Sequence, residues 1–505
     1  MQLEQGTYEK RVVDHEELLS DEEVLKKPVG RNCLCPCNSK KKYKNCCLEQ
    51  DEAKARRQQL SKTFLELFDL TGTGRLAQFE KYAAQVFSVP KLLSEYTDSR
   101  RGPDIPTFDV VNCLFHAALF RIPSINALEG NLKETDFQKL AGFQPKQNDK
   151  VFSADVVANV LDKLDLSCAR KSMVSVIRQA ERNKAFREGW HGALRYVALD
   201  GWEPFCSYSR HCPHCLTRMI EKKLPNGEKT KVVQYYHRFV VAMMIDGTTD
   251  LSIDFEPVRP ADQREDDYKD KRHEGELTAA KRLISRVKRT HPWLDVMVGD
   301  SLYTNGPFLS LLNELKMGAV LIAKKTGDEP LRDALSIWGD SPPEKIIDEP
   351  VSKERIELWD LKDIETLDTY NGKIRVVRGL VTKPKAHGPT TWCMAVIGKA
   401  NKLSSRQVLA VARGRWHIEN TGFHQWVTHW NLNHVFRHTD NALKAILYIW
   451  TLAFNLLQLF IYRRLKRERR PKDPTDTIRH IVEVMARNIA NLKAPIPWEK
   501  IIAAL

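Results

Sequence analysis

Three acidic residues carry the clearest chemical signal in this 505-residue chain. Asp200 and Asp300 each end a short apolar run, as expected at the ends of buried strands, and Glu419 lies in the helical segment 415–420. Two strand-end aspartates and a later helical glutamate can meet at one point although they are far apart in sequence. Carboxylates are the hard oxygen ligands that Mg²⁺ prefers, and two such ions about 4 Å apart promote phosphodiester chemistry. We therefore predict a site for two Mg²⁺ (Mn²⁺ is possible), with Asp200 bridging the ions and Asp300 and Glu419 holding one each.

Each acid also has a purely structural interpretation. Asp200 precedes a glycine and could form a turn, and Asp300 could cap the segment that follows it. Glu419 could be only the i+4 ion-pair partner of Arg415, worth a few tenths of a kcal/mol. If the site is catalytic, Arg415 lies one turn from Glu419 on the same helical face, where its guanidinium could hold a phosphate near the metals.

A cluster of cysteines near the start of the chain predicts a metal site of another kind. Cys35, Cys37, Cys46 and Cys47 are spaced C-x-C-x8-C-C. In a reducing compartment such a cluster suggests metal ligands rather than disulfides, and four thiolates on a short loop can close a tetrahedral Zn²⁺ site. Zinc would supply most of the folding free energy of so small a module, roughly 10 kcal/mol or more.

A second group of cysteines follows Asp200. Cys206, Cys212 and Cys215 are spaced C-x5-C-x2-C, and His237 could be a fourth ligand. The spacing allows a structural zinc that stiffens the first hairpin. It equally allows free thiols in a loop.

Composition points to a polyanionic partner. The chain is 42% hydrophobic, enough to fill real cores, and carries a net charge of +14 with a pI near 9.1. Such a balance favours nucleic acid over a membrane surface. No basic-then-apolar signal segment stands at Met1, so we expect a cytoplasmic protein, in the bacterial nucleoid.

The periodicity of apolar residues predicts an α/β protein with an RNase H-like mixed sheet. After residue 195 we expect three strands with a hairpin (196–200, a single strand 232–245, and 251–255), then helix, strand, helix, strand. A β-rich insertion precedes the helix of Glu419, whose start is marked by Ser404 and Gln407 as a capping box. The expected domains are a mobile tail at 1–27, a zinc module at 28–50, a helical DNA-binding domain at 51–190, a catalytic domain at 191–440 with the insertion at about 325–402, and a C-terminal helical region at 441–505.

One segment has nearly the length of a membrane span. Residues 445–462 are almost wholly apolar, but Asn455 and Gln458 near the middle favour a buried helix of a soluble core. The basic run 463–472 follows it. That run, like the basic residues 170–187, is a candidate for contacts with a DNA backbone.

Two stretches resemble known families. Residues 30–47 resemble the SEC-C motif, the zinc-binding tail of the bacterial preprotein translocase ATPase. Asp200-Gly201, Gly-Asp-Ser-Leu-Tyr at 299–303 and Arg-Gly-Arg-Trp-His-Ile-Glu-Asn at 413–420 look like the three acidic blocks of the DDE transposases of bacterial insertion sequences. The nearest resemblance is to the group with a β-rich insertion and a third block of the form Y-x2-R-x3-E-x6-K. Ala412 and Trp426 stand where that block has tyrosine and lysine.

The transposase resemblance implies an enzyme that cuts transposon ends and joins them to target DNA with a two-metal DDE mechanism. It implies catalytic roles for Asp200, Asp300, Glu419 and Arg415, double-stranded DNA as the partner, and a homodimer or larger assembly on DNA. Two other interpretations remain open: an inactive, transposase-derived DNA-binding regulator, and a SEC-C zinc adaptor for protein or ribosome partners.

Overall fold

The chain divides into two compact units. The computed structural model describes residues 32–35, 37, 39–48, 74–141, 151–186, 194–223, 227–245, 249–263, 273–323, 329–384, 386–465 and 478–487. One unit is Met1–Glu66 with Ala503–Leu505, and the other is Leu67–Ile502. The expected tail at 1–27 and residues 466–472 of the basic run lie outside the described residues.

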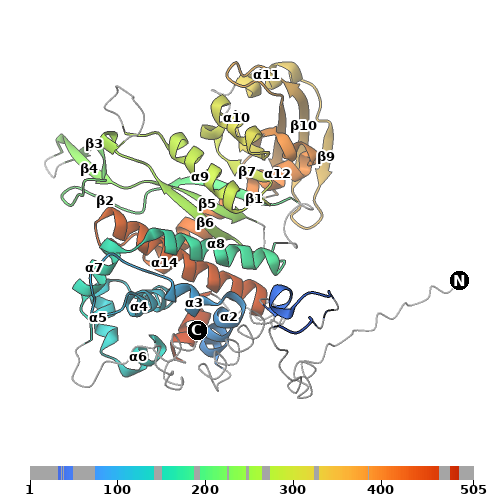
Figure 1. Ribbon diagram of the computed structural model, residues 1–505. Helices are drawn as coiled ribbons and strands as arrows, with labels where there is room; N and C mark the ends of the chain where they lie inside the picture. Colours follow the sequence, from blue (N-terminus) through green and yellow to red (C-terminus); the bar gives the residue numbers. More distant parts are fainter. Residues whose placement is uncertain are drawn as a thin grey trace. The chain divides into compact units, whose positions relative to one another are not determined.

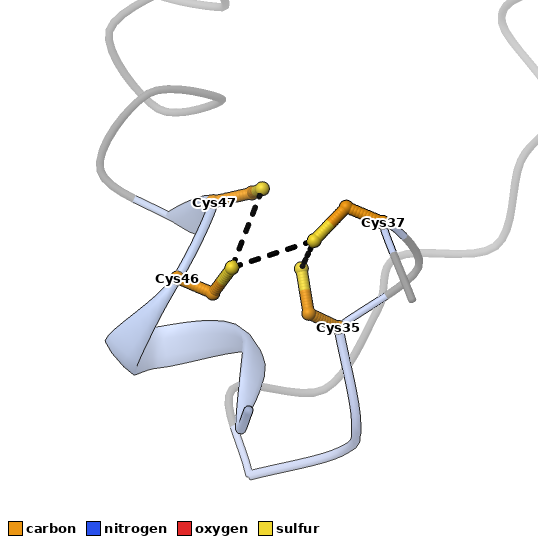
Figure 2. A group of neighbouring side chains, drawn as sticks. All are labelled: Cys35, Cys37, Cys46 and Cys47. Atoms are coloured by element: carbon orange, nitrogen blue, oxygen red, sulfur yellow. Dashed lines mark hydrogen bonds between the residues drawn. The ribbon is translucent and has the colours of Figure 1, made fainter. Parts of the chain in front are cut away.

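The described part of the first unit is a small knuckle around the first cysteine group. An antiparallel bridge joins Leu34 to Lys42, and the short 3-10 helix η2 (Tyr43–Asn45) leads from it to Cys46. This path brings the two ends of the C-x-C-x8-C-C run together, so that its four side chains face one another (Figure 2).

A nine-stranded mixed sheet forms the centre of the second unit (Figure 1). Its order is β6 (Leu251–Pro257), β5 (Phe239–Ile245), β1 (Tyr196–Trp202), β7 (Val296–Gly299), β8 (Gly318–Ile322), β12 (Thr390–Ile397), β11 (Ile374–Thr382), β10 (Arg355–Ile364) and β9 (Lys345–Asp348). Strands β1, β7 and β8 are parallel, and every residue of β5 and β7 is buried. Continuous apolar runs of this kind are typical of strands covered on both faces. The RNase H-like arrangement is formed by the first five strands in this sheet order, from β6 to β8, which confirms the predicted fold class.

The β-rich insertion continues this sheet. Strand β12 pairs antiparallel with β8, and β11, β10 and β9 follow outward. The sequence predicted strands here but not that they would extend the core. The physical reason is that β8, which is almost wholly buried, would otherwise leave backbone N–H and C=O groups unpaired along its outer edge.

The predicted single strand at 232–245 is two strands. Residues Lys229–Tyr236 form β4, which joins a separate small sheet in the order β2 (Cys206–Ser207), β4, β3 (Leu216–Lys223), while β5 belongs to the main sheet. The break falls at His237 and Arg238. His237 is buried there, and its ring points toward the second cysteine group.

Helices from both ends of this unit pack together. The N-terminal ones are α2 (Arg75–Phe87), α3 (Val89–Ser94), α4 (Thr107–Leu119), α5 (Ile125–Leu132), α6 (Thr135–Ala141), α7 (Ala154–Lys163) and α8 (Leu166–Arg182); the C-terminal ones are α14 (Asp440–Leu459), the π-helical segment η7 (Phe460–Arg464) and α15 (Ile478–Arg487). Helix α14 packs against α4, α7 and α8, and α8 and α14 both contact β6 (Figure 1). The expected helical regions at 51–190 and 441–505 therefore share one core where they are described.

Helix α14 is a core helix. The continuous helical stretch Asp440–Arg464 is long and apolar enough to span a membrane, but 94% of its most apolar window is buried inside the protein. Asn455 has a specific role there, because its side-chain amide donates to the Ser252 carbonyl at 2.7 Å and accepts from the Ser252 N–H at 2.9 Å. It thereby satisfies backbone groups on the outer edge of β6, as a buried polar side chain must.

The remaining helices flank the sheet and hold the functional side chains. They are α9 (Glu276–Thr290), the 3-10 segments η3 (Ala261–Gln263), η4 (Ser301–Tyr303) and η5 (Gly398–Lys402), α10 (Gly306–Glu314), α11 (Glu329–Trp338), α12 (Ser405–Gly414), the π-helical segment η6 (Ile418–Phe423) and α13 (His424–Trp430). The capping box at the start of α12 is present as predicted, with both the Ser404 and Gln407 side chains bonded to backbone N–H groups.

Candidate active site

The two aspartates end neighbouring parallel strands. Strands β1 and β7 pair in a register that sets Ala198 opposite Val298, so two further residues along each strand bring Asp200 beside Asp300. Adjacent strands are about 4.8 Å apart, and residues at equal register point to the same side. The pKa of Asp200 is raised chiefly by burial, and the charge of Asp300 adds to the rise, as expected of two carboxylates at close range.

Glu419 reaches the same place through Arg415. The Arg415 guanidinium donates from Nη1 to Asp200 Oδ2 at 2.7 Å and from Nη2 to Glu419 Oε1 at 2.8 Å. The i+4 pair considered from sequence therefore exists, but the same side chain also bridges to an acid 215 positions earlier. Glu419 lies in the π-helical turn η6, a distortion that is frequent at functional sites.

Ionisation of the Asp200 carboxyl is unfavourable in the folded protein. Burial raises the pKa of its carboxyl from the usual 3.8 to about 6, and the charges of Glu419 and Asp300 add to the rise although Arg415 opposes it. A carboxylate that is costly to ionise in the free protein is one that gains from a bound cation. The donor set of three carboxylates, all hard oxygen ligands, fits Mg²⁺ or Mn²⁺.

The three acids are arranged more loosely than the cysteine groups. Among the described residues, two clusters bring their ligand atoms within 4.8 Å of one another: one consists of four cysteines, and the other of two cysteines and two histidines. At the acid site the Arg415 guanidinium lies between Asp200 and Glu419, where it satisfies both carboxylates. In this arrangement the Arg415 guanidinium is the positive charge that neutralises two of the three acids.

Two departures from the third transposase block are explained by packing. Ala412 and Trp426 are both buried, so neither is a surface contact for DNA. The Trp426 ring packs edge-on against Trp202 at 5.2 Å and so attaches the helical segment of Glu419 to β1. His417 is also structural in its contacts, with Nδ1 lying 2.6 Å from Oδ2 of the buried Asp250.

A fourth acid, Glu276, adjoins the site and was not singled out from sequence. It is the first residue of α9, and its Oε1 accepts a hydrogen bond from the buried Tyr303 hydroxyl at 2.9 Å. Burial raises the pKa of Glu276, and the charge of Asp300 contributes to the rise. Gly201 makes room for it, since a Cβ there would lie 2.4 Å from Glu276 Oε2. Only the Tyr303 in the motif after Asp300 hinted at such a partner.

Gly201→Ala is expected to displace Glu276 and to cost about 1.5–3 kcal/mol, the usual value of a hydrogen bond to a charged group. The obstacle is the tip of a side chain, so the fold should persist. Urea unfolding of Gly201→Ala, Glu276→Ala and the double variant checks this. The double variant should be no less stable than Glu276→Ala alone; additive losses would contradict the proposed clash.

The first cysteine group has the geometry of a metal site. The Sγ atoms of Cys35 and Cys37 are 3.3 Å apart, those of Cys37 and Cys46 are 3.4 Å apart, and those of Cys46 and Cys47 are 3.7 Å apart (Figure 2). Hydrogen bonding with Ser39 and then with Cys35 lowers the pKa of Cys37 to about 6, which favours the thiolate that a metal requires. Cys33, the remaining cysteine of the run, is exposed and outside the group.

The second cysteine group differs from the predicted set by one ligand. Cys212, Cys215 and His237 come together, but the fourth member is His438, between α13 and α14. Cys206 lies outside the cluster, and its sulfur accepts a hydrogen bond from the Gln234 amide at 3.2 Å. His438 is 223 positions from Cys215 and carries no local motif, so sequence spacing could not reveal it.

The RNase H-like sheet thus carries an acid on its first strand, an acid after its fourth and a glutamate on a later helix. Comparison with known families supports a DDE transposase. Residues 226–456, a little under half of the chain, match the family described as Transposase DDE domain. The matched range contains Asp300, Arg415 and Glu419 and begins after Asp200, and it supports a transposase function in general. No curated protein matches the chain.

Proposed function

We propose that this protein is a DNA transposase that cleaves transposon ends and transfers the freed strand to target DNA. The observation that carries the proposal is the convergence of three acids: Asp200 and Glu419 share the Arg415 guanidinium, and Asp300 lies close enough to Asp200 for its charge to act on that carboxyl. Asp300 also caps η4 by accepting from the Leu302 N–H at 2.9 Å, and Glu419 also forms the i+4 pair with Arg415. These local contacts do not require the three carboxylates to converge, and like charges at a partly buried site oppose one another, so their convergence favours a functional role.

The chain's own residues have distinct roles in this proposal. Asp200, Asp300 and Glu419 would hold the divalent ions, with Asp200 as the shared ligand. The bound ions would make an attacking oxygen more acidic and stabilise the leaving oxygen of the phosphodiester. Arg415 now pairs with two of these acids, and with the acids occupied by cations its guanidinium would be free to hold a DNA phosphate beside them.

Exposed side chains beside the acids suit a DNA strand. Leu302 lies two residues after Asp300, and Trp416 follows Arg415; their side chains are 43% and 44% exposed. An exposed indole offers a stacking surface for a base. Pairing of two DNA ends requires a homodimer or larger assembly, which we include in the proposal.

The basic residues of α8 are less available for DNA than the sequence suggested. Arg170 donates to the Tyr448 hydroxyl at 2.8 Å, and Arg178 donates to the Thr290 carbonyl at 2.9 Å. Both side chains attach α8 to neighbouring elements. DNA binding by the helical region would therefore depend on other basic residues, such as Lys171 and Lys184.

The N-terminal module is proposed to hold zinc through Cys35, Cys37, Cys46 and Cys47. The Sγ separations are close to the edges of a tetrahedron with Zn–S bonds of about 2.3 Å. This supports the SEC-C resemblance as a metal-stabilised module.

Cleavage of a plasmid that carries the coding region with its natural flanking DNA tests the function. With Mg²⁺, the parent protein should cut at discrete positions in the flanks, and Asp300→Ala should lose about a thousandfold in rate, as expected for removal of several kcal/mol of metal-based stabilisation. Equal rates in the two proteins would remove the metal site from the proposal. Specific DNA binding without cleavage by the parent would instead favour the inactive DNA-binding regulator.

A further inference from the structure

Two cysteines and two histidines form a compact ligand group outside the acid triad. The Cys212 and Cys215 sulfurs are 3.7 Å apart, and His237 Nε2 lies 3.4 Å from the first and 3.3 Å from the second. His438 Nε2 lies 3.3 Å from the Cys215 sulfur. All four ligand atoms are within 4.8 Å of one another.

These separations match the edges of a zinc tetrahedron. Bonds of about 2.3 Å to sulfur and about 2.0–2.1 Å to nitrogen give S···S edges of about 3.8 Å and S···N edges of about 3.6 Å. A disulfide does not explain the group, because the sulfurs are too far apart for a bond and a disulfide would make no use of two converging imidazoles.

The surroundings also suit a closed metal site. Cys215 and His237 are buried, and the Cys212 backbone N–H donates to the Cys215 sulfur at 3.3 Å. The Phe205 ring packs against both histidine rings, with centroids 5.8 Å away in each case. Hydrogen bonding to a thiolate and an apolar shell are the outer contacts that orient ligands and exclude water.

We propose that Cys212, Cys215, His237 and His438 bind one Zn²⁺ as a structural site. With four protein ligands it has no open position for substrate, which distinguishes it from a catalytic zinc. It is separate in sequence and composition from the four-cysteine group, so the intact chain would hold two zinc ions.

The position of the ligands gives this zinc a second consequence. Cys212 and Cys215 belong to the excursion that leaves β1 just after Asp200, and His438 lies between the helical segment of Glu419 and α14. One ion would thus tie the segment after the first catalytic aspartate to the connector after the catalytic glutamate. This positioning role rests on the proposed function, whereas zinc binding itself does not.

Zinc content of the full-length protein tests the site, with Cys37→Ser used to remove the first group. Purified without chelator and with thiols reduced, the Cys37→Ser protein should retain one zinc per chain. Adding His438→Asn should weaken its binding by more than the roughly 10- to 100-fold lost when an outer-shell partner is removed. Adding Cys206→Ser is the matched control and should leave the zinc in place, since that sulfur is outside the cluster.

A spectroscopic measurement on the Cys37→Ser protein tests the site even if the His438→Asn variant fails to fold. The Cys37→Ser protein loaded with Co²⁺ alone should show tetrahedral absorption bands with the charge-transfer intensity of two thiolates. Absence of metal from that protein, or its loss on Cys206→Ser, would overturn the proposal. Because neither readout depends on cleavage, an inactive parent protein would count against the transposase function and leave the zinc site standing.

Discussion

Asp200→Asn is expected to abolish metal-dependent DNA cleavage while making the metal-free protein more stable at neutral pH. Burial and the neighbouring acids raise the pKa of Asp200 from 3.8 to about 6, so the folded state favours the protonated form. The folded chain therefore binds more protons than the unfolded chain between these two values, and stability falls as pH rises through that window. A rise of this size in the pKa corresponds to about 3 kcal/mol above the window.

Urea unfolding at about pH 3.5 and about pH 7.5 in the absence of metal checks the prediction. Asn keeps the shape of Asp200 and removes its charge, so the gain should appear at the higher pH and vanish at the lower one. Asp363→Asn is the control, because that carboxylate is 67% exposed. A variant of Asp200 that is less stable than the parent at neutral pH would contradict the charge assigned to this site.

Arg415→Ala is expected to destabilise the metal-free protein by about 2 kcal/mol, less than the roughly 3–5 kcal/mol of a fully buried pair because the two acids are partly exposed. Its removal leaves Asp200 and Glu419 without their shared cation. Mg²⁺ or Mn²⁺ can then bind without displacing a guanidinium, so the metal should raise the unfolding temperature more in this variant than in the parent. Cleavage should fall by roughly tenfold to a hundredfold through the lost phosphate contact.

Arg413→Ala provides the matched control for this experiment. Arg413 lies in the last turn of α12, two residues before Arg415, and its guanidinium donates two hydrogen bonds to the Glu354 carboxylate, both at 2.9 Å. Its loss should lower stability without changing the response to metal, because Glu354 is not part of the acid site. An equal metal response in the two variants would show that Arg415 does not compete with cations.

Local patterns in the sequence were sufficient for the elements that bear the acids. Apolar runs identified β1 and β7, and the Ser404 and Gln407 spacing identified the start of α12. These features depend on residues within a few positions of one another, so the chain order carries them. The prediction of a single strand at 232–245 was wrong, because such local patterns do not show contacts with residues farther along the chain. The strand breaks at His237, whose ring turns toward Cys215.

What the sequence determined by itself was the RNase H-like order of elements and the strand ends that present Asp200 and Asp300. Tertiary structure alone decided that Arg415 bridges to Asp200, that Glu276 fills the space left by Gly201, and that His438 replaces Cys206 in the second cysteine group. The reason is physical: strand and helix formation is governed by near neighbours, whereas these contacts join residues tens to hundreds of positions apart and exist only once the sheet and helices have packed.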